Sequence, residues 1–371
     1  MTIRICGDEV MTFDDVLIIK NGKNQRAVEN PDGKYPIYGS GGIMGYADDY
    51  ICEADTVIVG RKGSINNPIF VEEPFWNVDT AFGLVAKREV LLPRYLYYFC
   101  RNYDFERLNK AVTIPSLTKS DLLKIEITLP SLEIQEKIVN KLLKIEEVIQ
   151  ARQQQLQKMD ELVKARFIEL FGDPATNPYG WQQLTVNDVC VSVVRGPFGS
   201  ALKKEFFVPP SDTTYKVYEQ KHAIQKSSTI GTYYVTAEKY NELRRFECHS
   251  GDILMSCSGT MGELYQLPAG CERGIINQAL CKFTLNERIL PIVFLAYMRE
   301  TIGNLETKGS GIQNIAAVSY VKAMPINLPP MRVQEQYATF VEQTDKSKVA
   351  VQKALDKAQL LFDSLMQKYF G

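Results

Sequence analysis

The stretch that decides the architecture is residues 127–172, because the chain carries it twice. It opens with ITLPSLEIQEKIV (127–139) and closes with LVKARFIELFG (162–172). It aligns without gaps onto residues 326–371, which open with INLPPMRVQEQYA and close with LFDSLMQKYFG. Both copies share the residues Ile127/Ile326, Leu129/Leu328, Pro130/Pro329, Gln135/Gln334, Glu136/Glu335, Phe171/Phe370 and Gly172/Gly371. A gapless match of this length, with proline and glycine at its ends, indicates an internal repeat.

Each copy predicts one long helix, over residues 127–172 and 326–371. The prolines lie just before or within the first turn, where proline is tolerated, and the glycines stand where a helix C-terminus favours glycine. At 1.5 Å per residue, some 35 helical residues would form a rod of roughly 50 Å. The alternative is an amphipathic helix packed on a globular domain.

An apolar seam of average period 3.5 runs along each predicted helix and favours a coiled coil. Arg152 and Arg166 interrupt it in the first copy, and Thr344 and Lys348 in the second. The sustained length without an internal glycine or proline also favours the coiled coil, as does the second copy, with which the first could pair. The seam residues are Ile138, Leu142, Ile145, Ile149, Leu156, Met159, Val163 and Leu170, then Val341, Val351, Leu355, Phe362, Leu365 and Tyr369.

The residues before each helix, 1–126 and 179–325, predict two globular domains of mixed α+β type, joined through a linker at 173–178. Residues 55–59 and 251–255 have the composition of strands, and each run leads into a glycine-bearing turn, at 60–63 and 258–262. Short helical patterns follow at 93–100 and 291–298. Polar loops at 113–118 and 309–314 then lead to the long helices. The chain therefore alternates domain, helix, domain, helix.

Composition bounds the class of protein. The chain has 371 residues and a net charge of −1. The first residues do not resemble a signal peptide, and no apolar run approaches the ~18 residues of a membrane span. The eight cysteines form no CxxC pair, and adjacent Cys248 and His249 are poorly spaced to bind one zinc ion, so we expect no metal site and a cytoplasmic location.

Motifs of several enzyme classes are missing from the sequence. It has no GxxxxGK[ST] phosphate loop, no GxSxG elbow and no HExxH helix. Residues 67–70 (NPIF) are one substitution from an adenine methyltransferase motif, but no cofactor-binding βαβ unit precedes them. A nuclease motif would have only Pro31-Asp32, and two histidines leave little general-base chemistry. We therefore expect no catalytic centre and no cofactor in this chain.

The order of these elements resembles the specificity subunits of type I restriction–modification systems over essentially the whole chain. The fragments that carry the resemblance are YPIYGSGGIMGY (35–46), GRKGS (60–64), FWNVDT (75–80), SGTMG (258–262) and the two helix starts. The resemblance implies two target recognition domains that each read half of a bipartite DNA site, with two helices paired antiparallel as a spacer. Two unlike domains imply an asymmetric site.

The resemblance also implies partners. These are double-stranded DNA, adenine-N6 methyltransferase subunits that use S-adenosylmethionine and, in some systems, an ATP-driven restriction subunit. A net charge of −1 is unusual for a protein that holds DNA alone, because phosphate neutralisation dominates affinity. DNA binding would therefore need basic residues gathered on one face, or phosphate contacts from partner subunits.

Candidate DNA-binding residues are those whose side chains suit base edges and that lie in or beside glycine-rich turns, where backbone can approach DNA closely. In the first domain these are Ser40, Tyr46, Arg61, Lys62, Ser64 and Asn66, and in the second Lys203, Lys204, Lys221, His222, Ser258 and Thr260. The alternative is that residues 60–63 and 259–262 are simply strand turns. A surface position for His222 is equally compatible with the pattern.

Gln135, Glu136, Gln334 and Glu335 are not assigned to acid–base chemistry. They lie in the first turn of a long helix, where such side chains cap free amides and favour the helix dipole. Two alternatives stay open at this point. One is a coiled-coil scaffold that binds no DNA, and the other is a specificity module that works with a methyltransferase alone.

Overall fold

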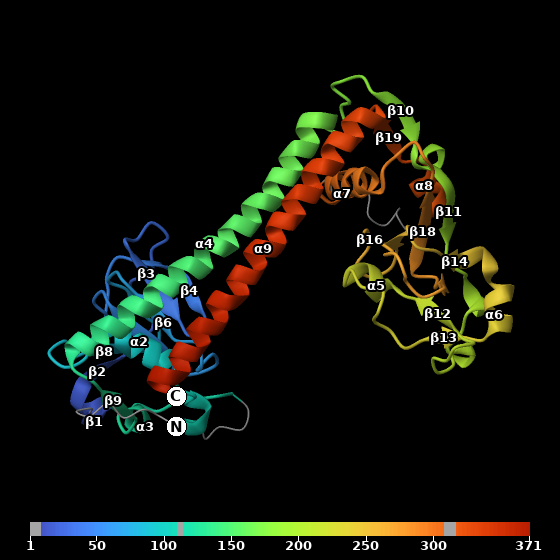
Figure 1. Cartoon of the computed structure of the whole chain (residues 1–371). Coiled ribbons are helices and arrows are strands. Elements are labelled where there is room, and N and C mark those ends of the chain that lie inside the picture. Colours follow the sequence, from blue (N-terminus) through green and yellow to red (C-terminus); the bar gives the residue numbers. More distant parts are fainter. Residues whose placement is uncertain (1–8, 110–113, 308–316) are drawn as a thin grey trace. The chain divides into compact units, whose positions relative to one another are not determined.

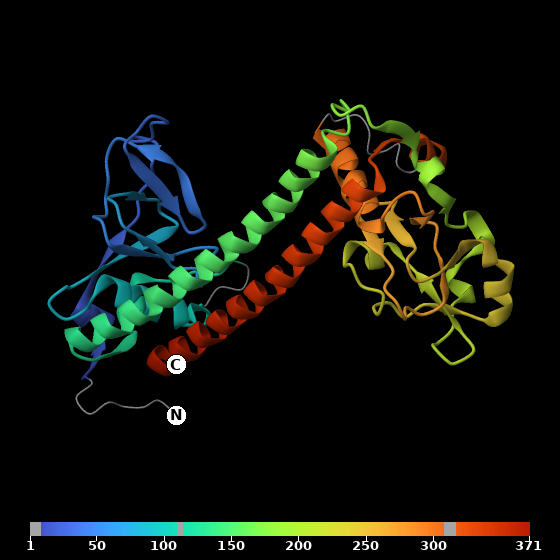
Figure 2. The same cartoon turned by 45° about the horizontal axis from the view of Figure 1, so that its top comes forward.

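The computed structural model describes residues 9–109, 114–307 and 317–371, and the chain forms two compact units. Unit 1 comprises Met1–Gln155 and Ala350–Gly371, and unit 2 comprises Leu156–Val349. Each unit holds one globular domain together with one end of each long helix (Figures 1 and 2). The polar loop predicted at 309–314 and the first residue of the loop at 113–118 lie outside the described residues.

The domain of unit 1 consists of three small sheets and short helices. A ribbon pairs β1 (Glu9–Thr12) with β9 (Glu126–Leu129). An antiparallel sheet has the order β2 (Leu17–Asn21), β8 (Ala81–Ala86), β5 (Thr56–Gly60), β6 (Ile69–Val71). A mixed sheet has the order β4 (Gly42–Ala47), β3 (Tyr35–Gly39), β7 (Trp76–Asn77), with β3 and β7 parallel. The helices are α1 (Phe13–Val16), α2 (Pro93–Asn102), η1 (Phe105–Leu108) and α3 (Lys119–Leu122).

The domain of unit 2 repeats this plan. Its ribbon pairs β10 (Gln182–Thr185) with β19 (Pro325–Leu328). Its antiparallel sheet has the order β11 (Cys190–Arg195), β18 (Leu280–Leu285), β15 (Ile253–Ser256), β16 (Leu264–Gln266). Its mixed sheet has the order β13 (Tyr234–Val235), β12 (Tyr215–Tyr218), β17 (Gly274–Ile276), β14 (Glu247–Cys248), again with one parallel pair. The helices α7 (Pro291–Thr307) and α8 (Val318–Ala323) take the places of α2 and α3.

The second domain also contains further short helices. They are η2 (Val186–Val189), η3 (Gly199–Ala201), η4 (Lys204–Phe206), α5 (Gln220–Ile224), α6 (Ala237–Glu242) and η5 (Arg244–Phe246). The first of these has a counterpart in α1, since the same capping box opens both: Asp15 accepts from the Thr12 N–H at 2.9 Å, and Asp188 from the Thr185 N–H at 2.8 Å. The repeat therefore extends through both domains, beyond the helical copies that the sequence revealed.

The long helices are α4 (Leu132–Phe171) and α9 (Met331–Phe370), each of 40 residues. The prediction that they begin at residues 127 and 326 is wrong for the first residues, since 127–129 and 326–328 belong to β9 and β19. Proline after each strand ends the ladder before the helix begins. The predicted C-terminal glycine is confirmed at Gly172, whose φ is +77°.

The two helices run side by side and antiparallel within each unit. In unit 1 the start of α4 meets the end of α9, where Phe362 and Met366 join the core that contains Ile138 and Leu142. In unit 2 the rings of Phe167 and Phe171 pack on Tyr337, and Lys348 pairs with Asp160 at 2.5 Å. None of the fourteen predicted seam residues is exposed, whereas the off-seam residues Leu162 and Leu360 are. The regular interlocking of a coiled coil stays a prediction.

Gln135 and Gln334 fasten the helices to the domains. Each side chain is almost fully buried. The amide oxygen of Gln135 accepts from the N–H of Leu92, just before α2, and that of Gln334 accepts from the N–H of Leu290, just before α7, both at 2.9 Å. The Gln135 amide nitrogen donates to the carbonyl oxygens of residues 90 and 130, and that of Gln334 to those of residues 288 and 329. The identical residue thus makes the same three bonds in both copies.

No helix of the described part of the chain is long and apolar enough to cross a membrane.

Candidate nucleic-acid interface

A turn at residues 60–64 follows the central strand β5 and is held on both sides. Gly63 has a φ of +81°, which disfavours other residues, and a methyl group on Gly60 would lie 2.3 Å from the Ser64 carbonyl oxygen. The Arg61 N–H donates to the carbonyl oxygen of Thr80 at 2.7 Å. On the other side, the Gly63 N–H donates to the carbonyl oxygen of Pro115 at 3.1 Å. The turn is therefore a fixed platform for its exposed side chains.

Four of the six residues predicted for the first domain gather on this turn. Arg61, Lys62 and Ser64 are exposed on it. Ser40 follows β3, and its Oγ lies 3.6 Å from where a Cβ on Gly63 would stand. Among the described residues, the Arg61 guanidinium contacts the Asp79 carbonyl oxygen, at 3.4 Å, and the face of Phe82. Its hydrogen-bonding donors thus remain largely available to a ligand.

The other two residues lie elsewhere. Tyr46 is on β4, 44% exposed, on a hairpin that also exposes Ile43 and Met44. Asn66 caps the 3-10 helix η1, since its amide oxygen accepts from the Phe105 N–H at 2.7 Å and its nitrogen donates to Asp104 at 3.1 Å. Those hydrogen bonds give Asn66 a structural role, although the residue is exposed.

Unit 2 presents the matching turn at residues 256–260. Gly60 pairs with Ala81, the first residue of β8, and Ser256 pairs with Leu280, the first residue of β18. Because β8 and β18 occupy the same place in the two sheets, residues 60–64 correspond to residues 256–260. Gly63 corresponds to Gly259, whose φ is +59°. The predicted residues Ser258 and Thr260 are exposed on this turn.

Gln220, which sequence reasoning missed, takes the place that Ser40 has in unit 1. Its Nε2 lies 3.1 Å from where a Cβ on Gly259 would stand, and it follows β12 as Ser40 follows β3. A signal was available, because glutamine is a side chain that reads adenine and Gln220 directly precedes the predicted residue Lys221. Lys221 itself pairs with Glu219 at 2.7 Å and lies 5.3 Å from the ring centroid of Tyr233.

Each domain thus exposes one glycine-held turn with a polar neighbour from the mixed sheet. One family model, the type I restriction modification DNA specificity domain, matches residues 7–160 and again residues 178–360. The two matches cover most of the chain. The protein belongs to the type I DNA specificity family.

Relatives in this specificity family align with parts of the chain. A putative type I specificity subunit from Mycoplasma pneumoniae (strain ATCC 29342) is 26% identical over 148 residues, which are 38% of this chain and 48% of that protein. A putative type I restriction enzyme specificity subunit from Haemophilus influenzae (strain ATCC 51907) is 28% identical over 133 residues, 34% of each chain. The alignments span half or less of these curated relatives.

Solved structures from type I restriction-modification systems match nearly the full length of the chain. The S subunit of a type I restriction-modification system from M. genitalium has a TM-score of 0.60 at 17% identity and covers 100% of this chain and 98% of its own. A chain from a structural study of complex assembly and conformational transition of a type I R-M system has a TM-score of 0.65 at 16% identity, with 99% and 98% covered. At these identities the likeness establishes the shared fold.

The structure corrects the assignment of His222 in this specificity-family protein. The side chain is fully buried, so it is neither a surface histidine nor placed to contact a base. Its Nδ1 accepts from the Glu219 N–H at 2.9 Å, and its Nε2 lies 2.7 Å from the Ile230 carbonyl oxygen, so the proton belongs on Nε2. Burial lowers the pKa of His222, which keeps the ring neutral. We remove His222 from the candidate interface.

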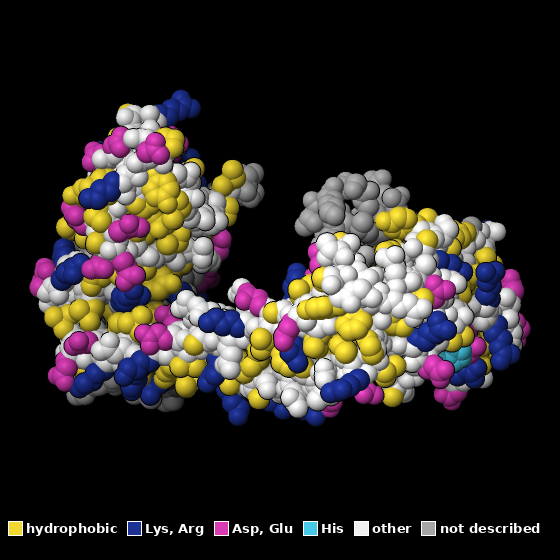
Figure 3. Space-filling view, turned by 90° about the horizontal axis from the view of Figure 1, so that it is seen from above, with side chains coloured by type: hydrophobic (Ala, Val, Ile, Leu, Met, Phe, Trp, Pro, Cys, Tyr) yellow, Lys and Arg dark blue, Asp and Glu magenta, His cyan; other side chains and the backbone are white. Residues whose placement is uncertain are grey.

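Lys203 and Lys204 are exposed but lie on the segment around η4, and Lys203 pairs with Glu205 at 3.6 Å. Figure 3 shows that Lys and Arg side chains alternate with Asp and Glu over the face that it draws. Lys and Arg side chains are therefore not gathered into one basic surface on that face. Among the described residues no group of three metal-binding side chains occurs.

Proposed function

We propose that this chain reads two half-sites of double-stranded DNA, one with each domain, and supplies sequence specificity to adenine-N6 methyltransferase subunits. The observation that supports this proposal is the repeated turn. Equivalent backbone turns expose Arg61, Lys62 and Ser64 in one domain and Ser258 and Thr260 in the other. A shared scaffold with different side chains suits the reading of two different base sequences. The site is then bipartite and asymmetric.

The chemistry of the turns fits base reading. Arginine and lysine donate to guanine O6 and N7, glutamine bonds adenine, and small hydroxyls suit several bases. Arg61 and Lys62 are therefore assigned to a guanine-containing first half-site, and Gln220 with Ser258 and Thr260 to the second. S-adenosylmethionine, and ATP where a restriction subunit takes part, would bind in the partner chains. We assign no catalytic step to this chain and place the complex in the cytoplasm with the DNA.

The test is methylation mapping. The chain is expressed with its neighbouring methyltransferase in a host free of adenine methylation, and modified adenines are sequenced genome-wide. A split motif with a fixed unread gap is the expected result. A soluble complex of the two proteins that methylates no new motif would instead support a scaffold without DNA recognition. Adding a restriction subunit in a second strain separates the methyltransferase-only module from the full restriction complex.

Exchange of residues 1–126 for another recognition domain tests the division of labour. The exchange replaces β1 and leaves residues 127–129 of β9 in place, so the incoming domain must supply a strand that pairs with β9. The expected outcome is that one half of the methylated motif changes while the other half stays the same. A change in both halves would contradict reading by separate domains.

A further inference from the structure

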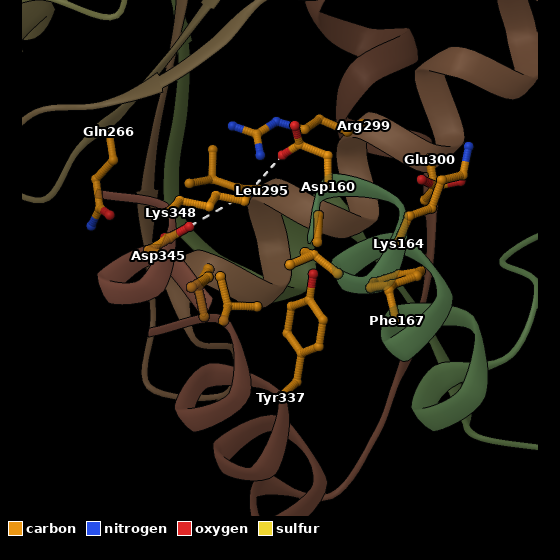
Figure 4. Close-up of a pocket in the computed structure, with 14 residues that line it drawn as sticks. Asp160, Lys164, Phe167, Gln266, Leu295, Arg299, Glu300, Tyr337, Asp345 and Lys348 are labelled. Atoms are coloured by element: carbon orange, nitrogen blue, oxygen red, sulfur yellow. Dashed lines mark hydrogen bonds and ion pairs between the residues drawn. The ribbon is translucent and has the colours of Figure 1, made fainter. Parts of the chain in front are cut away.

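A pocket of about 410 Å³ lies wholly within unit 2, between the end of α4, the start of α9 and one side of α7 (Figure 4). Its apolar wall includes Val163, Phe167, Ala296 and Tyr337. Charged side chains surround the wall, and in Figure 4 dashed lines join Lys348 to Asp160 and Asp345, at 2.5 and 3.7 Å. An apolar cavity with a few charged groups at its edge is typical of a binding site.

The internal repeat identifies the equivalent place in unit 1. The bonds of Gln135 and Gln334 to the N–H groups of Leu92 and Leu290 align α2 with α7 at an offset of 198 residues. The long helices align at an offset of 199. Ala296 on α7 therefore corresponds to Tyr98 on α2, and Val163 on α4 corresponds to Phe362 on α9.

In unit 1 this place is filled by the protein's own aromatic rings. Tyr98 and Phe362 are both buried, and their ring centroids lie 6.3 Å apart in an edge-on arrangement. The Tyr98 hydroxyl donates to Glu146 at 2.5 Å. Arg101 pairs with the same carboxylate and lies 4.8 Å from the Phe362 ring centroid. The Tyr98 hydroxyl thus has a carboxylate acceptor, and the Phe362 ring has a cation over its face.

Unit 2 keeps the charged groups and lacks the rings. Asp345 corresponds to Glu146 and Arg299 to Arg101, while alanine and valine replace tyrosine and phenylalanine. Arg299 is exposed and makes no hydrogen bond or ion pair to any described residue. The pocket is therefore the space of two missing rings, with a carboxylate and a cation still in place beside it.

We propose that the pocket of unit 2 binds a tyrosine side chain presented by a partner protein. The ring would bury apolar surface against Phe167 and Ala296, Asp345 would accept from the hydroxyl, and Arg299 would lie over the ring as Arg101 lies over Phe362. A carboxylate acceptor favours tyrosine over phenylalanine. Aromatic anchors in pockets carry much of the binding energy of protein interfaces.

The first test measures binding of p-cresol, the side-chain analogue of tyrosine, to the full chain by methyl NMR. Binding should shift the methyl signals of Val163 and Ala296, and also those of Leu295, which the double variant below keeps. The double variant Val163→Phe/Ala296→Tyr supplies the rings of unit 1 and should abolish binding. Asp345→Asn, at an exposed position, should weaken p-cresol binding about tenfold and leave toluene binding unchanged, since only p-cresol donates a hydrogen bond. Absence of p-cresol binding, or equal loss of toluene, would overturn the proposal.

The second test identifies the protein that supplies the tyrosine ring. Of the two tests, only this one rests on the proposed function. In the assembled complex with methyltransferase subunits, a photo-crosslinker at the exposed position 164, at the edge of the pocket, should capture a tyrosine-containing peptide of the partner, and p-cresol should no longer bind. A complex in which p-cresol still binds would show a small-molecule site and overturn the proposed partner. Methylation mapping is a separate readout, so failure here leaves the DNA-reading proposal standing.

Discussion

Arg61 and Lys62 project from a turn whose backbone is fixed by hydrogen bonds to two neighbouring segments. We expect Arg61→Ala and Lys62→Ala to relax or change the first half-site and leave the second intact. Loss of a bidentate guanine contact costs about 1–3 kcal/mol of discrimination. Methylation mapping checks this, with Ser258→Ala as the matched change in the other domain. A uniform loss of methylation at all sites would indicate phosphate contacts instead.

Glu247 illustrates how a buried residue can set the acid stability of unit 2. Burial raises its pKa, but hydrogen bonds from Tyr240 and Arg273 outweigh this and hold the pKa below its ordinary value. A lowered folded-state pKa stabilises the fold above the ordinary value of about 4.3, and this stabilisation is lost as the pH falls through the folded pKa.

The expected outcome is that Glu247→Gln flattens the fall in unfolding free energy between neutral pH and about pH 3. The chain offers a clean signal because its two tryptophans, Trp76 and Trp181, lie one in each unit. In a Trp76→Phe background, urea unfolding followed by fluorescence reports on unit 2. Glu242→Gln, at an exposed position, is the control. An unchanged pH profile would assign the acid sensitivity to other carboxylates.

The secondary-structure elements are held together by long-range hydrogen bonds that no local sequence pattern predicts. Gln135→Ala removes the acceptor of the Leu92 N–H, and Gln334→Ala that of the Leu290 N–H. An unsatisfied buried group costs about 1–3 kcal/mol, so each variant should destabilise its own unit by that amount. The tryptophan of the same unit reports the unfolding. Glu136→Ala and Glu335→Ala are exposed controls, expected within about 0.5 kcal/mol of the parent.

Local patterns predicted the elements well and their partners poorly. Periodicity gave α4 and α9, and glycine placement gave the turns at 60–63 and 259–262, because both signals are local in sequence. Residues 127–129, which the repeat assigns to the helix, form a strand because they pair with β1, more than a hundred residues away in the sequence. The burial of His222 depends on Gly231, whose φ is +89° and where a methyl group would lie 3.0 Å from the ring.

At the scale of the whole molecule, the long helices cross from one unit to the other at Gln155 and Val349. Seven residues inserted in helical register after both positions would add roughly 10 Å to the helix pair. If the helices set the distance between the half-sites, the unread gap of the methylated motif should grow by about three base pairs at 3.4 Å each. Insertion into one helix alone is the control, expected to disrupt the pairing. An unchanged gap would show that the helices do not set the spacing.

The division into units has a consequence for synthesis on the ribosome. Unit 2 is continuous in sequence, whereas unit 1 needs residues 350–371, whose Phe362 and Met366 complete its core. At about 5–20 residues per second, roughly 10–40 s separate the emergence of residue 155 from that of residue 371. During that interval the nascent first domain keeps an open apolar face where the end of α9 will later lie. The half of the protein that is made first is therefore finished last.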